Sequence, residues 1–187
     1  MPSWARVATR SRVPLGFLFA AAYLWWARPT WISLLSGSAC VALGVVLRAL
    51  ASGHIRKNSE LATTGPYAYT RNPLYLGSVL IAAGFLVAAR NVWIGLAASA
   101  MFIFIYVPVI KAEEAYLRSA FPDYAAYAGR VPRLLPRLTP YRGDGGADAD
   151  QKHFSAELYM RHREYNAALG SALMIGALIL KMVLVLR

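Results

Sequence analysis

The chain of 187 residues is poor in cysteine, histidine and acidic side chains. Its single cysteine, Cys40, lies in an apolar run, so the chain can form neither an internal disulfide nor a thiolate cluster for zinc. The histidines His54, His153 and His162 lack the spacing of metal ligands, and we expect no metal site. The sequence has no G-x-G-x-x-G motif and no alternation of strand and helix patterns, which argues against a Rossmann sheet.

The scarcity of acidic residues leaves a strong positive charge. Nine Asp and Glu stand against 20 Lys and Arg, for a net charge of +11. In a soluble protein this balance would indicate nucleic-acid binding. However, 58% of the residues are hydrophobic, and the basic residues flank apolar runs instead of forming a patch interleaved with aromatic residues. The composition therefore predicts an integral, multi-pass membrane protein that binds membrane lipids and no nucleic acid.

Five apolar runs match or approach the length of about 20 residues that a membrane helix needs. They predict a single domain over residues 1–187 with helices over residues 9–27, 30–51, 73–89, 92–112 and 166–186. Tight breaks at Arg28-Pro29 and Arg90-Asn91 join neighbouring helices, and Pro108 is expected to kink the fourth helix. The predicted fold class is all-α, a bundle of five transmembrane helices.

The basic residues also predict how the bundle is oriented. Fifteen of the 20 Lys and Arg fall in residues 1–12, 52–72 and 111–165, whereas three lie on the opposite side. Cytoplasmic loops of membrane proteins are enriched in these residues. We therefore expect the N-terminus and the polar segments 52–72 and 113–165 in the cytoplasm, and the C-terminus on the other side. Arg48 and Lys181 lie within helices and are expected to extend their charged ends to the headgroups, with a role in a site as the alternative for Arg48.

The most informative stretch is short, polar and aromatic, and apolar sequence flanks it. It reads Gly65-Pro66-Tyr67-Ala68-Tyr69-Thr70-Arg71-Asn72-Pro73-Leu74-Tyr75-Leu76-Gly77. Pro73 suits the first turn of a helix, and Asn72 directly before it is predicted to be the N-cap. Arg71 then lies at the membrane surface. An arginine, an asparagine and three tyrosines at the mouth of a membrane helix indicate a ligand site.

A second group of residues follows the fourth helix. Glu113 and Glu114 end its apolar run, where paired carboxylates are costly unless they are partnered or hydrated. The expected topology places them on the same face as Arg71, at the end of a neighbouring helix. Arg71 or the arginines of residues 130–137 are candidate partners. Residues 159–165, which include Glu164, either close this site from the C-terminal side or lie on the membrane surface.

Together the two blocks resemble the isoprenylcysteine carboxyl methyltransferase family and its phospholipid methyltransferase relatives. The first block carries the family's Gly-Pro-Tyr, Arg-Asn-Pro, Tyr and Gly. The second consists of Glu113, Glu114, Leu117, Phe121, Tyr124, Tyr127, Val131, Pro132, Arg133 and Pro136. The resemblance covers about residues 50–137. It implies that S-adenosylmethionine binds at the cytoplasmic face without a Rossmann sheet, with S-adenosylhomocysteine as product.

The resemblance also implies which residues form the site. The catalytic residues are expected to be Glu113, Glu114 and Arg71. The residues expected to bind the cofactor are Tyr67, Arg71, Asn72, Pro73, Tyr75, Leu76, Glu113, Glu114, Leu117, Tyr127, Arg130, Val131 and Arg133. An arginine can bind the cofactor carboxylate, a glutamate can accept from its ammonium or ribose, and tyrosines can enclose its adenine. Which glutamate, if either, acts as a base stays open.

The predicted function is methyl transfer from S-adenosylmethionine to a lipophilic acceptor that carries an amine, a thiol or a carboxylate. One alternative is N-methylation of a phospholipid amine, and another is a non-catalytic scaffold or transport-associated protein. Many isoprenylcysteine enzymes have histidine at the position of Asn72. Unlike histidine, asparagine cannot titrate near neutral pH, so prenylcysteine is a weaker candidate acceptor. Transport would require charged or broken helices near the membrane centre, and these runs are nearly free of charge. The oligomeric state is left open.

Overall fold

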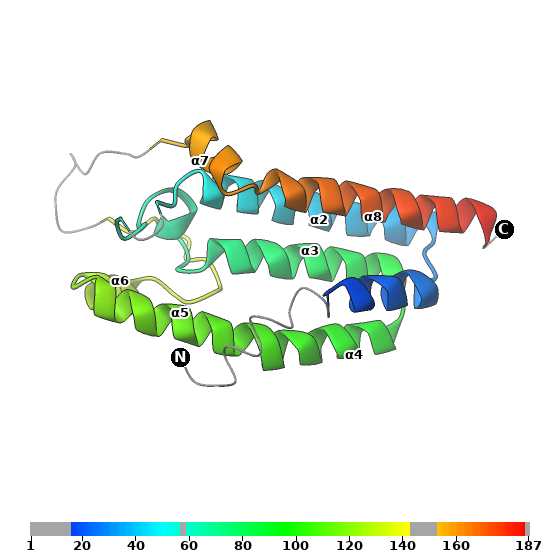
Figure 1. The fold of residues 1–187 in the computed structure, drawn as a ribbon, viewed down its shortest axis with the longest axis horizontal. Helices are drawn as coiled ribbons and strands as arrows, with labels where there is room; N and C mark the ends of the chain where they lie inside the picture. Colours follow the sequence, from blue (N-terminus) through cyan, green and yellow to red (C-terminus); the bar gives the residue numbers. More distant parts are fainter. Residues whose placement is uncertain (1–15, 57–58, 143–152, 186–187) are drawn as a thin grey trace.

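The computed structural model describes residues 16–56, 59–142 and 153–185, and within these ranges the regular elements are all helical. In chain order they are the helix Gly16–Trp26, α2 (Trp31–Ser52), η1 (Gly65–Ala68), α3 (Pro73–Ala89), α4 (Val92–Met101), η2 (Phe102–Tyr106), α5 (Val107–Ala120), α6 (Tyr124–Arg130), α7 (Ala156–Arg161) and α8 (Tyr165–Leu184). The long helices lie side by side along the long axis, and η1, α6 and α7 gather at one end (Figure 1). We call this the polar end of the bundle. The all-α prediction is confirmed for the described ranges.

Three helices are long and apolar enough to cross a membrane, which makes this a membrane protein. They are α2, the continuous helix Val92–Ala120 that contains α4, η2 and α5, and α8. The helices Gly16–Trp26 and Pro73–Ala89 are also apolar but shorter. Residues 9–15 of the first predicted helix lie outside the described residues.

The predicted boundaries of the second and third helices are confirmed to within one residue. Thr30 caps α2 through a reciprocal pair of hydrogen bonds with Ser33. The third helix begins at Pro73 as expected and ends at Arg90, whose φ of 51° lies in the left-handed region. Asn91 then caps α4 by accepting from the amide of Trp93 at 2.9 Å. Both tight breaks therefore fall where the sequence placed them.

Glycines bring α2 and α3 into close contact. The two helices run antiparallel, so that Gly37 of α2 lies against Gly84 of α3 and Gly44 lies against Gly77. A Cβ on Gly44 would lie 2.6 Å from the carbonyl oxygen of Gly77, and one on Gly77 would lie 2.8 Å from that of Gly44. Since ordinary carbon contacts are about 3.5–4.0 Å, the two backbones touch without room for a methyl group. This contact fixes the register of the two helices that lead to the polar end.

The prediction that the fourth helix ends at residue 112 is wrong. Helix α5 continues to Ala120, so Glu113 and Glu114 lie inside a helix and not at the start of a loop. The sequence turns polar at Lys111, but the helix continues because its amphipathic pattern persists. The expected irregularity near Pro108 takes the form of the π-helical turn η2. Proline lacks an amide donor and crowds the carbonyl four residues earlier, which a wider turn relieves.

Lys181 does not extend to the headgroups as expected. Its Nζ donates to the carbonyl oxygens of Leu24 at 2.6 Å, Trp25 at 2.8 Å and Ala27 at 2.7 Å. A helix leaves its last carbonyls without intrahelical partners, and a cation there also complements the helix dipole. Lys181 therefore ties α8 to the end of the helix Gly16–Trp26.

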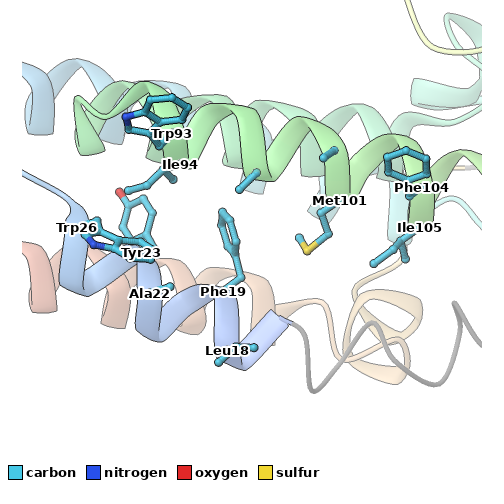
Figure 2. Close-up of a pocket in the computed structure, with 12 residues that line it drawn as sticks. Leu18, Phe19, Ala22, Tyr23, Trp26, Trp93, Ile94, Met101, Phe104 and Ile105 are labelled. Atoms are coloured by element: carbon cyan, nitrogen blue, oxygen red, sulfur yellow. The ribbon is translucent and has the colours of Figure 1, made fainter.

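An apolar groove of about 460 Å³ runs between the helix Gly16–Trp26 and α4 (Figure 2). It is lined by Leu18, Phe19, Ala22, Tyr23, Trp26, Trp93, Ile94, Ala97, Ala100, Met101, Phe104 and Ile105. Figure 2 shows the Phe19 ring reaching from the first helix toward α4. The groove ends at the π-helical turn η2, where Phe104 and Ile105 face it.

Candidate functional site

A cavity of about 630 Å³ lies at the polar end of the bundle, within the size range of small-molecule sites. Both sequence blocks line it, together with α2 and the start of α8. Eight predicted site residues are in its wall, namely Tyr67, Arg71, Asn72, Pro73, Tyr75, Glu113, Leu117 and Tyr127. Tyr106 of η2 also lines it, so this one turn borders both the cavity and the apolar groove.

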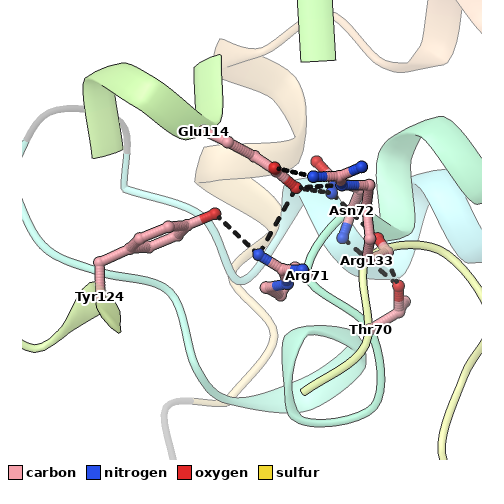
Figure 3. A network of polar contacts seen from close by, with 6 residues as sticks. All are labelled: Thr70, Arg71, Asn72, Glu114, Tyr124 and Arg133. Atoms are coloured by element: carbon pink, nitrogen blue, oxygen red, sulfur yellow. Dashed lines mark hydrogen bonds and ion pairs between the residues drawn. The ribbon is translucent and has the colours of Figure 1, made fainter. Parts of the chain in front are cut away.

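The convergence expected of the two blocks is observed at Glu114. The residue is 8% exposed, and its carboxylate accepts from Arg133 Nε at 2.9 Å and Nη2 at 2.7 Å, a bidentate pair (Figure 3). Arg71 Nη1 lies 3.6 Å from Oε1, and Asn72 Nδ2 donates to the same oxygen at 3.5 Å. The carboxylate is thus surrounded by its own protein partners. It stands behind the cavity wall, whereas Glu113, one residue earlier, faces the cavity.

Arg71 connects this network to the cavity. Its amide donates to the carbonyl of Pro132 at 2.9 Å, and its Nη1 donates to the hydroxyl of Tyr124 at 3.3 Å. Its Nε is buried and has no hydrogen-bond partner among the residues that the structure describes. Buried donors in native proteins are nearly always paired. A guanidinium with an unsatisfied donor, in the wall of a cavity, is suited to bind an anionic group of a ligand.

Asn72 is the residue before α3, as predicted, but its side chain does not cap the helix. Its Nδ2 donates instead to the carbonyl of Arg133 at 2.9 Å and to Glu114. The asparagine therefore holds the two blocks together.

Aromatic side chains form much of the remaining wall. Tyr124 and Tyr127 are buried, and the hydroxyl of Tyr127 donates to the carbonyl of Tyr67 at 2.7 Å. Burial raises the pKa of Tyr67 and Tyr127 well above the ordinary value of a phenol, so both hydroxyls stay neutral. On the membrane side Tyr75 meets Tyr106 edge to face, with ring centroids 6.3 Å apart.

Five predicted site residues do not line the cavity: Leu76, Glu114, Arg130, Val131 and Arg133. Val131 is buried against Tyr124 and Tyr127, and so supports the aromatic wall. The hydrogen bond to Glu114 raises the pKa of Arg133 and keeps its guanidinium charged. Glu114 and Arg133 thus lie in a layer behind Arg71.

Sequence reasoning missed an ion pair in the cavity wall, between Arg48 and Glu164. Arg48 donates from Nε and Nη2 to the two carboxylate oxygens of Glu164, each at 3.0 Å, and from Nη1 to the carbonyl of Leu74 at 3.2 Å. The expectation that Arg48 extends to the headgroups is wrong. An arginine within an apolar helix was the available signal, but its partner is 116 residues away. Glu164 closes the cavity from the C-terminal side, one of the two positions considered for it.

Fold and cavity define a helical membrane protein with a charged, aromatic cavity at one end of an apolar bundle. Residues 17–124, more than half of the chain, match the model of the phospholipid methyltransferase family. The chain belongs to this family, and the resemblance of the two sequence blocks is confirmed. No solved structure matches the chain.

Three curated relatives are similar to the chain over 120 to 125 residues. The chain is 38% identical to the cobalt-zinc-cadmium resistance protein CzcN of Cupriavidus metallidurans and 33% identical to the nickel-cobalt-cadmium resistance protein NccN of Alcaligenes xylosoxydans xylosoxydans, in each case over 62% of this chain and 56% of the relative. It is 32% identical to protein-S-isoprenylcysteine O-methyltransferase of Schizosaccharomyces pombe, over 66% of this chain and 48% of the relative. The chain thus spans about half the length of the curated relatives it matches.

Proposed function

We propose that this protein transfers a methyl group from S-adenosylmethionine to a lipophilic acceptor in the membrane. The observation that carries the proposal is the charge of the cavity wall. It holds three glutamates, at 60, 113 and 164, and two arginines, at 48 and 71, which leaves one net negative charge. S-adenosylmethionine has a sulfonium, an ammonium and a carboxylate, and therefore one net positive charge. The charges of wall and cofactor are complementary.

Each residue of the site has a proposed role that follows from its position. Arg71, which lines the cavity and has one hydrogen-bond donor unsatisfied, binds the cofactor carboxylate with its guanidinium. Glu113 accepts from the ammonium or the ribose, and the tyrosines enclose the adenine. Glu114 and Arg133 act through Arg71 by holding its guanidinium in place. Of the predicted catalytic residues, Arg71 and Glu113 therefore touch the ligand, and Glu114 is a positioning residue.

The bound cofactor supplies a sulfonium methyl group, whose bond to sulfur breaks as the bond to the acceptor forms. The protein's own contribution is to align the two partners and exclude water. An amine or thiol acceptor must also lose a proton, and Glu113 is the carboxylate of the second block that lines the cavity. A carboxylate acceptor requires no base.

The apolar groove is the observation that favours a lipophilic acceptor. It extends along α4 and η2 from Trp93 to Ile105, twelve steps or about 18 Å of helix, and so reaches the turn whose Tyr106 lines the cavity. An acceptor with its chain in the groove has its reactive head near the Tyr75–Tyr106 pair. The proposal includes five membrane-crossing helices, with the cavity and N-terminus on the cytoplasmic side and the C-terminus opposite, as the distribution of basic residues favours. N-methylation of a phospholipid amine is the alternative that the family name supports.

The relatives CzcN and NccN support a second candidate, a role in resistance to heavy metals. Within the ranges that the structure covers, no group of three or more His, Cys, Asp or Glu side chains is placed to hold a metal ion. We therefore propose that any such role acts through methylation of a membrane component and not through direct binding of the metal.

Titration of S-adenosylhomocysteine into the protein in lipid nanodiscs tests the proposed function. We expect one saturable site per chain, weakened about tenfold or more by Arg71→Gln, because a hydrogen bond to a charged group contributes about 1.5–3 kcal/mol. Arg90→Gln, which removes a guanidinium at the opposite end of the bundle, is the matched control. If the unaltered protein binds nothing in discs of several lipid compositions, the non-catalytic scaffold is the correct reading. If the protein does bind, a labelled methyl donor identifies the class of acceptor.

A further inference from the structure

Residues 130–142, which we call the arginine–leucine loop, combine positive charge with exposed apolar side chains. The loop contains four arginines and no acidic residue. Leu135 is 76% exposed and Leu138 is 98% exposed. Arg133 is paired with Glu114, whereas Arg137 donates to neutral acceptors, the carbonyl of Arg130 and the hydroxyl of Thr139. The loop lies outside the residues that match the family model.

Hydrogen bonds fix the depth of this loop relative to the bundle. The hydroxyl of Thr70 donates to the carbonyl of Leu134 at 3.0 Å, and Asn72 donates to that of Arg133 at 2.9 Å. The amide of Arg137 donates to the carbonyl of Tyr69 at 2.9 Å. These partners directly precede α3, whose apolar sequence begins at residue 73. The loop therefore lies at the level where apolar helix gives way to polar chain.

We infer that the arginine–leucine loop is a membrane contact that binds anionic lipid headgroups. Leu135 and Leu138 enter the boundary between headgroups and acyl chains, where leucines that water would otherwise surround are stabilised. Arg137 and Arg142 then lie at the depth of the lipid phosphates, and basic residues near an anionic surface are attracted to it. The charge of the loop and the exposure of its leucines point to the same partner, an anionic lipid surface.

The loop also connects that surface to the cavity. Arg133 is half exposed, with 53% of its side chain accessible, and its guanidinium holds Glu114, which in turn faces Arg71. A lipid phosphate that attracts Arg133 competes with Glu114 for the same donors. We expect anionic lipid to change the affinity of the cavity for S-adenosylhomocysteine, a consequence that rests on the proposed function. The membrane contact itself does not depend on it.

Site-specific fluorescence in nanodiscs tests the contact without any cofactor. In a Cys40→Ser background, a polarity-sensitive label is attached to Leu138→Cys in one sample and to Asp123→Cys in another. Asp123 is the matched control, because it follows α5, which extends ten residues or about 15 Å beyond Ile110. We expect the label at 138 to shift to shorter wavelength and to be quenched by lipids with nitroxide headgroups or shallow nitroxide chains. The label at 123 should stay aqueous.

Lipid charge and loop charge are then varied in turn. Replacing an anionic lipid by a zwitterionic one should reduce quenching at 138, and Arg137→Gln with Arg142→Gln should abolish this difference. Arg137 also donates to the carbonyl of Arg130 at 3.1 Å, so Arg137→Lys separates charge from loop structure and should behave like the unaltered loop. Equal quenching at 138 and 123, or quenching that ignores lipid charge, overturns the inference. In detergent, the label at 138 could instead become shielded as the protein concentration rises. That result would assign the surface to a second copy of the chain and would also overturn the inference.

Discussion

Adding one methyl group to Gly44 should separate α2 from α3 and weaken the protein. The new Cβ would lie 2.6 Å from the carbonyl oxygen of Gly77 and 2.8 Å from the backbone nitrogen of Ile81. Neither backbone atom can rotate away, so the helices must move apart by about 1 Å to reach normal contact. Overpacking of this kind costs about 1–3 kcal/mol, and alanine returns about 1 kcal/mol through its helix propensity. The net cost is therefore about 0–2 kcal/mol, and because both contacts are with rigid backbone we expect Gly44→Ala to lower the free energy of unfolding by about 2 kcal/mol, the upper end of the net range.

Gly95 is the matched control, because it is also a helical glycine but a Cβ there would meet no described atom within 4 Å. Gly95→Ala should leave stability unchanged or raise it by about 1 kcal/mol. Unfolding in mixed micelles with increasing denaturing detergent, followed by circular dichroism, measures both variants. Gly44 also lies one turn before Arg48 on α2, so the separation should weaken S-adenosylhomocysteine binding as well. If Gly44→Ala is as stable as Gly95→Ala, the two glycine pairs do not set the register of the bundle.

Three further predictions concern single side chains. Glu114→Gln keeps the size of the side chain but removes the charge that holds Arg71. We therefore expect titration to show weaker S-adenosylhomocysteine binding, with little change in the helical circular dichroism. Unchanged affinity would contradict the positioning role. Lys181→Met leaves three carbonyls without their donor and should cost about 2 kcal/mol in the same detergent titration, whereas an unchanged midpoint would show that the cap is dispensable. The buried hydroxyl of Tyr127 has a pKa raised above its ordinary value of 10.0, so its contribution to stability is complete below that pH and is lost as the pH rises above it. Unfolding followed between pH 8 and pH 12 should therefore show a smaller alkaline loss for Tyr127→Phe, at the cost of about 1 kcal/mol for the bond to Tyr67.

Local sequence determined the helices and their ends where a residue acts on its own neighbours. Pro73 and Asn91 mark the starts of α3 and α4, because proline suits the first turn and asparagine accepts from free amides. Long apolar runs predicted the membrane helices for the same reason, since hydropathy is a property of the run itself. The two motif blocks likewise indicated the family and most of the cavity wall, including Arg71 and Tyr67.

Sequence reasoning failed where a local pattern competed with a distant partner. Asn72 is a residue type that commonly caps helices and stands directly before α3. Its side-chain amide nevertheless donates to Glu114 and to the carbonyl of Arg133 in the second block. Lys181 and Arg48 resembled charged residues that reach the headgroups, because nothing near them in the chain offers a partner. The carbonyl partners of Lys181 and the acidic partner of Arg48 are more than 100 residues away in the sequence.

Tertiary structure alone decided which of two adjacent glutamates faces the cavity. Glu113 and Glu114 differ by about 100° around α5, so only one can point into the cavity while the other contacts Arg133. Which one does so depends on how α5 is rotated against α3 and the arginine–leucine loop. The sequence determined that this is a helical membrane protein of the methyltransferase family with two site blocks. The packing of its helices decided which charges meet, because a periodic pattern specifies the faces of a helix but not the partner of each face.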